Sequence, residues 1–168
     1  WNGSTWTTTT ALPTGRQSAM AANQGTTTAG CIFGGVTDTP FPPTLTYLNI
    51  HEQWNGSAWS EVNNLNTARK EGGGGGNQGA AFAAGGNTGS PSALVEIWNG
   101  TSWTEVNNIN TARQNTGSAG TTTSALLYSG DGPVQITEKF DGTSWTEVAD
   151  LADSHVQPGK GTGLSGGS

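Results

Sequence analysis

Short apolar runs, separated by polar residues that favour turns, recur along the whole chain. Residues 94–98 (Leu-Val-Glu-Ile-Trp) and 103–106 (Trp-Thr-Glu-Val) are two such runs. They are rich in β-branched and aromatic side chains, and Gly, Asn, Asp or Pro bounds them, which is typical of β-strands. Asn99-Gly100 between them supplies the positive φ angles of a tight turn. The pattern therefore predicts β-hairpins.

The same six-residue phrase occurs four times. It reads Trp-Asn-Gly-Ser-Thr-Trp in its first copy and begins at residues 1, 54, 98 and 140. Spacings of roughly 40–50 residues are typical of the blades of a β-propeller, in which each blade has four strands. The order of apolar runs in each repeat predicts four strands. We therefore expect residues 1–168 to form a single, all-β propeller domain.

Each repeat places large and small residues in a fixed order. A Gly- and Ala-rich stretch follows the second half of every hairpin and would form the inner strands, because stacked sheets approach closely near a propeller axis. The large indoles would fill the wider rim. We expect four tryptophans to occupy equivalent, mostly buried sites: Trp6, Trp59, Trp103 and Trp145. The outer strand 103–106, with Trp103 and Val106 on opposite faces, is expected to be buried on both faces.

Three features of the repeat resemble the Kelch repeat of β-propellers. Arg113 precedes an inner strand, Gly85-Gly86 follows an apolar strand, and Trp98 and Trp103 form a spaced aromatic pair. The resemblance spans the chain, although the aromatics are closer together than is usual and Ser129-Gly130 replaces one double glycine. The Thr-, Asn- and Gly-rich repeat also resembles propeller repeats in tail or appendage proteins of aquatic bacteriophages.

The elements amount to about three and a half Kelch-like blades, fewer than the ~4–8 that known propellers use. The sequence allows three solutions: a longer polypeptide, several copies that complete a ring, or two chain ends that share one blade. We expect a fragment whose ends are completed by further blades of the same chain or by protein partners, because exposed strand edges are normally covered.

Composition and charge limit both the fold classes and the kinds of binding partner that this sequence allows. With 27 Gly and 7 Pro in 168 residues, a helical bundle is excluded. The formal charge of −6, from 12 acidic and 6 basic residues, leaves no basic patch for nucleic acid. No apolar stretch approaches the ~18 residues of a membrane span, so we expect no membrane insertion. The single Cys31 excludes an internal disulfide framework.

Two sets of residues suggest chemistry. The repeated arginines could converge on a carboxylate, but a residue that recurs in every blade is distributed around a ring, and the Kelch resemblance implies a scaffold role. These arginines are Arg16, Arg69 and Arg113. A Kelch-like copper oxidase would need Tyr, His and Cys ligands. The candidates are Cys31, Tyr47, Tyr128, His51 and His155. Because neither His belongs to a spaced ligand pair, we expect no enzyme, no metal and no cofactor.

The most variable segment, residues 36–53, contains Pro40-Phe41-Pro42-Pro43 and is longer than its counterparts. We expect a stiff loop, and loops on a rigid scaffold commonly carry recognition. The candidate binding residues are Phe41, Tyr47 and His51. A loop that merely covers the edge of a blade explains the segment equally well.

Together these features predict a non-enzymatic structural or binding module of a larger surface assembly, such as a bacteriophage virion appendage involved in attachment. We expect the protein to be located outside the cell or on the virion surface. The alternative is a multivalent lectin that binds host-surface glycans in Trp-lined pockets between blades. A lectin requires exposed aromatic side chains there, whereas a scaffold buries them. A Kelch-like copper oxidase is the remote third alternative.

Overall fold

The structure is a computed structural model that describes residues 3–40, 43–131 and 135–153. These residues form fourteen β-strands and no helix. The strands are β1 (Met20–Ala21), β2 (Gly30–Phe33), β3 (Val36–Pro40), β4 (Pro43–Tyr47), β5 (His51–Trp54), β6 (Trp59–Glu61), β7 (Gly73–Asn77), β8 (Ala80–Ala84), β9 (Val95–Trp98), β10 (Trp103–Val106), β11 (Gly117–Gly120), β12 (Ala125–Tyr128), β13 (Thr137–Phe140) and β14 (Trp145–Val148).

Twelve of the strands form three antiparallel, four-stranded sheets. The first sheet has the order β1-β2-β5-β6, the second β7-β8-β9-β10 and the third β11-β12-β13-β14. The turn between the third and fourth strand of each sheet is closed by an Asn or Asp side chain. Asn99 Oδ1, for example, accepts hydrogen bonds from the backbone N–H groups of Thr101 and Ser102 at 2.9 Å. The prediction of four-stranded, blade-like sheets joined in this way is confirmed.

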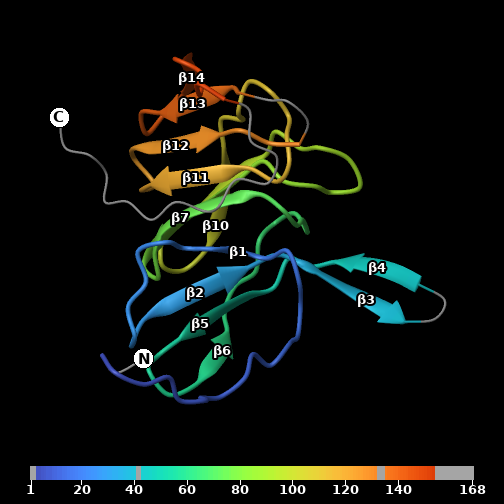
Figure 1. Ribbon diagram of the computed structural model, residues 1–168, viewed down its shortest axis with the longest axis vertical. Helices are drawn as coiled ribbons and strands as arrows, with labels where there is room; N and C mark the ends of the chain where they lie inside the picture. Colours follow the sequence, from blue (N-terminus) through green and yellow to red (C-terminus); the bar gives the residue numbers. More distant parts are fainter. Residues whose placement is uncertain (1–2, 41–42, 132–134, 154–168) are drawn as a thin grey trace.

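The inner strands β1, β7 and β11 lie side by side, and the first and third sheets extend away from them in opposite directions in Figure 1. The small residues permit this close approach. A Cβ added to Gly74 would lie 2.6 Å from the carbonyl oxygen of Ala21 in β1. On the other side, the Ser118 hydroxyl in β11 hydrogen-bonds both the N–H and the C=O of Gly74 at 2.9 Å. Four glycines in succession thus lie in the packed inner strand β7.

Two apolar cores lie between the sheets. The first contains Phe33 of the first sheet and Trp98 and Trp103 of the second. The second contains Phe82 of the second sheet and Trp145 of the third. Trp103 and Trp145 stand at the same repeat position of the two cores. Alternate residues of one strand face opposite neighbouring sheets.

The expected equivalence of the four tryptophans is wrong for Trp6. Trp103 and Trp145 are buried between sheets and Trp59 is half-buried, but 82% of Trp6 is exposed. Residues 3–15 contain no strand, so Trp6 is not enclosed by sheets as Trp103 is. The outer strand β10 contacts both cores as expected, with Trp103 in the first core and Val106 packed against the second, while Thr104 and Glu105 between them are exposed.

The expected loop over residues 36–53 is instead largely β-structure. β3 and β4 pair as a hairpin from Val36↔Tyr47 to Pro40↔Pro43, and β5 begins at His51. Alternating Thr residues fit the extended backbone. The hairpin projects sideways from the body of the molecule (Figure 1). The described residues therefore form blade-like sheets and a projecting hairpin, and within them the sheets do not close into a ring.

Candidate functional site

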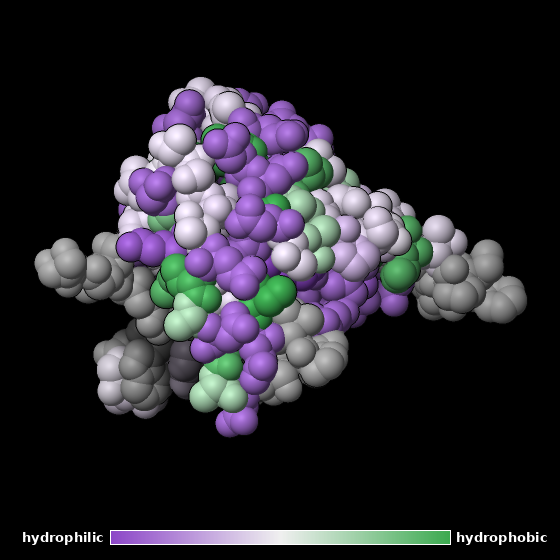
Figure 2. All heavy atoms as spheres, turned by 90° about the horizontal axis from the view of Figure 1, so that it is seen from above, coloured by the Kyte–Doolittle hydropathy of each residue, from purple (hydrophilic) through white to green (hydrophobic). Residues whose placement is uncertain are grey.

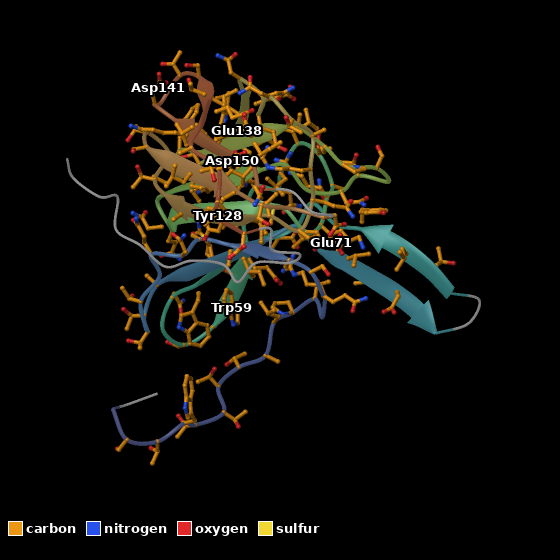
Figure 3. The ribbon with its side chains drawn as sticks, turned by 45° about the horizontal axis from the view of Figure 1, so that its top comes forward. Trp59, Glu71, Tyr128, Glu138, Asp141 and Asp150 are labelled. Carbon is orange, nitrogen blue, oxygen red and sulfur yellow. The ribbon has the colours of Figure 1, made fainter. Side chains whose placement is uncertain are left out.

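Each repeated arginine forms a buried ion pair with a glutamate. Arg16 pairs with Glu52, Arg69 with Glu96 at 3.0 Å, and Arg113 with Glu138, and all six side chains are at most 3% exposed. Figure 3 places Glu138 within the third sheet. Each guanidinium thus has its own carboxylate, and the three do not converge on one place.

Backbone groups complete each pair. Arg69 donates to the carbonyl oxygens of Leu94 at 3.1 Å and Ala83 at 3.4 Å, while Glu96 accepts from the backbone N–H of Asn66 at 2.7 Å. Loss of hydration on burial lowers the pKa of Arg69, although the Glu96 carboxylate opposes that shift. The pairs therefore fix the loop before each inner strand to the sheet, which is a scaffold role.

The same arrangement holds Glu138. Burial raises the pKa of this carboxyl group, but the N–H groups of Asn110 and Thr111 and the Arg113 guanidinium outweigh burial, so the pKa is lowered overall. Sequence reasoning missed these glutamates. The signal was present, because a Glu stands two residues before the first aromatic residue of three repeats, as in Glu96-Ile97-Trp98.

A chain of hydrogen-bonded polar side chains joins the projecting hairpin to the loops of the second and third sheets, at the end of the sheets where the long loops emerge. Tyr47 is the last residue of β4 and lies at the base of the projecting hairpin. Its hydroxyl donates a hydrogen bond to Asn87 Oδ1 at 3.0 Å. The Asn87 amide donates to Gln114 Oε1, and Gln114 donates to Asp131 Oδ2 at 2.5 Å. Asn115 also donates to Asp131, at 2.7 Å. We call these five residues the loop-face network.

A strained backbone position supports the loop-face network. Ser18, Glu71 and Asn115 occupy the same place in successive repeats and all have positive φ, between 54° and 60°. Their backbones are joined in series: Glu71 N–H donates to Ser18 C=O at 2.9 Å, and Asn115 N–H donates to Glu71 C=O at 2.6 Å. Non-glycine residues adopt this conformation only when the surroundings impose it, and such positions cluster at functional sites.

Lys70 supplies a cation next to the loop-face network. Its ammonium group donates to the Glu71 carboxylate at 2.8 Å, and this hydrogen bond raises the pKa of Lys70. Figure 3 shows Glu71 near the base of the β3–β4 hairpin. The loop-face network and the neighbouring Lys70–Glu71 pair therefore bring amides, a phenol, carboxylates and an ammonium group close together.

The three residues proposed to bind a partner lie in different surroundings. Phe41 lies outside the described residues, and half-buried Tyr47 belongs to the loop-face network. His51 is fully buried between Phe33 and Trp98, so its imidazole cannot contact a partner at the surface. Its assignment to a loop is corrected, because it opens strand β5 and its ring packs between the first and second sheets.

The remaining candidate ligands for a metal lie apart. Cys31 is buried in β2, and burial raises the pKa of its thiol to about 11. Tyr128 lies in β12 of the third sheet, and His155 lies outside the described residues. Within residues 3–40, 43–131 and 135–153, no three His, Cys, Asp or Glu side chains gather as a metal site requires. Nor does this part of the chain contain a helix long and apolar enough to cross a membrane.

Two hollows open on the surface. One, of about 320 Å³, lies at the base of the hairpin and is lined by Arg16, Gln17 and Asp38. The other, of about 560 Å³, lies between the outer parts of the first and second sheets and is lined by Glu61, Asn63 and Thr101 among others. Asn63 crosses the second hollow and donates to the Thr101 carbonyl at 2.8 Å.

Comparison with known proteins shows the fold. A solved structure titled "Structure of YjhT" superposes with a TM-score of 0.70 at 14% sequence identity. The match covers 88% of this chain and 56% of that chain, so the present chain spans little more than half of its structural relative. No protein-family model matches the sequence, and no curated protein matches it. At this identity the likeness concerns the fold alone.

Proposed function

We propose that the chain is a non-enzymatic binding module of a Kelch-like β-propeller, part of a larger assembly on a virion or cell surface. The observation that carries this proposal is the loop-face network. It joins the projecting hairpin and loops of the second and third sheets into one polar surface, and propellers have such surfaces built from the loops of a rigid scaffold. The network residues and their neighbours at the base of the hairpin, Lys70 and Glu71, form the contact area of the proposed partner.

The chemistry of the loop face favours binding over catalysis. Its groups are satisfied by one another: Gln114 receives a hydrogen bond from Asn87 and gives one to Asp131. A nucleophile paired with a general base is the signature of covalent catalysis, whereas the Tyr47 hydroxyl of the network is hydrogen-bonded to an amide oxygen, which is not a general base. The proposed module therefore binds without converting its partner.

The location has a direct test. Antibodies against the 168-residue chain, used in immunogold electron microscopy of the source virions or cells, should decorate a surface appendage. Label confined to the cell interior would contradict the proposal. Elemental analysis of the purified chain tests the non-enzymatic assignment in parallel. Stoichiometric copper, lost together with an oxidase activity in His51→Ala, would overturn it.

The contact area has a separate test. A photo-reactive amino acid at exposed position 131, in the loop-face network, should cross-link to another protein in the assembled particle. The same probe at exposed Thr123, in the β11–β12 turn at the opposite end of the sheet, is the matched control. Equal cross-linking from both positions would show that the loop face is not the contact area.

Carbohydrate binding is the second candidate. Amide and carboxylate side chains beside a tyrosine can donate to and accept from sugar hydroxyls, and the loop-face network contains all three. The tryptophan pockets first considered for a lectin are not open, because Trp98, Trp103 and Trp145 are buried. Binding of the chain to a glycan array tests this candidate. A lectin should bind defined glycans, Gln114→Ala should abolish that binding, and Thr123→Ala should retain it. An array without hits removes this candidate.

A further inference from the structure

The outward side of the third sheet carries apolar residues that the other two sheets bury. Leu126 stands at the repeat position of Cys31 and Phe82, with β12 in the place of β2 and β8. Cys31 lies in the core between the first and second sheets, and Phe82 lies in the core between the second and third. Phe82 is 2% exposed, whereas Leu126 is 40% exposed.

The outer strand and the following loop repeat this contrast. Val62 packs against the first core and Val106 against the second, but their counterpart Val148 is 38% exposed. Leu65 and Ile109 are buried, and their counterpart Leu151 is half-buried. We call Leu126, Val148 and Leu151 the back face.

The opposite end of the molecule shows the complementary surface. Trp54 and Trp59 of the first sheet form a ring pair with centroids 5.5 Å apart, and both are half-buried. Their counterparts in the second and third sheets are buried against the sheet that precedes them. These are Trp98, Trp103, Phe140 and Trp145. We call Trp54 and Trp59 the front face.

The front and back faces fit each other because the molecule joins such faces twice already. At both internal boundaries, the residue at the repeat position of Leu126 meets the aromatic pair of the next sheet: Cys31 lies with Trp98 and Trp103, and Phe82 lies with Phe140 and Trp145. The first and third sheets lie at the two ends of the ribbon in Figure 1. Figure 2 views the end that carries the third sheet and shows apolar patches within a mainly polar surface.

We propose that two copies of this chain associate head to tail, with the back face of each copy on the front face of the other. Three sheets from each copy would give a ring of six, within the ~4–8 blades that propellers use. The structural relative is the longer chain, and the match covers 56% of it. A heterologous interface that closes in this way forms a ring instead of a filament.

The mass of the 168-residue chain in solution is the first test. Analytical ultracentrifugation should give twice the 17.1 kDa of one copy. Leu126→Glu places a charge in both interfaces and should reduce the mass to one copy. Leu45→Glu is the matched control, because Leu45 is equally apolar and 51% exposed but lies on the projecting hairpin. That variant should keep the doubled mass.

Mixing two variants tests the head-to-tail geometry. Leu126→Glu and Trp59→Ser should each be monomeric alone, and an equimolar mixture should recover the doubled mass, because one of the two interfaces is then wild-type. Misfolded variants cannot recover it. A monomeric wild-type chain, a mass that grows without limit, a Leu126→Glu chain of doubled mass or a dimeric Trp59→Ser chain overturns the proposal. A mixture that stays monomeric also overturns it.

Discussion

The indole Nε1 of Trp103 donates a hydrogen bond to Nδ1 of His51 at 3.2 Å, across the boundary between the second and first sheets. The two rings also pack with centroids 5.4 Å apart at 67°. This bond requires an unprotonated Nδ1, so the neutral imidazole carries its proton on Nε2. One side chain thus joins two sheets only while it is uncharged.

The free energy of unfolding should therefore decrease as the pH is lowered below the ordinary pKa of histidine. Burial lowers the pKa of His51 from 6.5 to about 4. Because the folded-state pKa is the lower one, the unfolded chain takes up the proton first. The contribution of neutral His51 is complete above pH 6.5 and is lost as pH falls toward 4. We expect a loss of about 3 kcal/mol in the free energy of unfolding over this interval, measured by urea denaturation.

His51→Gln is the control for this pH dependence. Its amide oxygen can still accept the Trp103 hydrogen bond, but the side chain does not titrate. The variant should show a smaller loss between pH 6.5 and 4.5. An unchanged slope in His51→Gln would assign the effect to other groups.

The buried and exposed indoles should differ sharply in their effect on stability. Trp103→Ala removes a buried ring from the first core and should cost about 3–5 kcal/mol. Trp6→Ala changes an indole that is 82% exposed and should stay within roughly 0.5 kcal/mol. Thermal and urea unfolding of the two variants measures both. Equal losses would mean that residues 3–15 are packed as firmly as the sheets.

Replacing one partner of a buried Arg–Glu pair should lower the free energy of unfolding more than replacing both partners. Arg69→Met leaves the Glu96 carboxylate buried without its cation and should lose about 3–5 kcal/mol. The double variant Arg69→Met/Glu96→Gln keeps an acceptor for the Asn66 N–H and should lose less than Arg69→Met alone. A double-mutant cycle in urea measures the coupling.

Lys70→Met is the matched control for the buried pair. Lys70 also pairs with a glutamate, Glu71, but both side chains are partly exposed, so the loss should be below about 1 kcal/mol. Similar losses for Arg69→Met and Lys70→Met would contradict the scaffold role of the buried pairs.

Two strand glycines should respond differently to alanine. In Gly74→Ala, the new Cβ would lie 2.6 Å from the Ala21 carbonyl oxygen, so the inner strands must separate, at a cost of about 1–3 kcal/mol. Gly30 also lies in a strand, but a Cβ there meets nothing within 4 Å. Gly30→Ala should be neutral or stabilise by up to about 1 kcal/mol. Melting temperatures of both variants give the comparison, and equal shifts would rule out close inter-sheet approach as the cause.

The strands, the hairpins and the repeat follow from the amino-acid sequence alone, because they depend on neighbours in the chain. Asn99-Gly100 forms its turn through a side chain that bonds residues two and three positions later. The alternation in β9 assigns Val95 and Trp98 to opposite cores in the same local way. The close-packed glycine strand also follows from composition.

Which residues face a neighbouring sheet depends on how the three sheets pack together. Arg69 meets Glu96 through a contact between residues 27 positions apart, and His51 meets Trp103 across 52 positions. The exposure of Trp6 and of Leu126 likewise depends on whether a second sheet covers the position, while their local sequences match those of buried counterparts. Burial at a repeat position is a property of the pair of sheets, and one repeat read alone does not contain it.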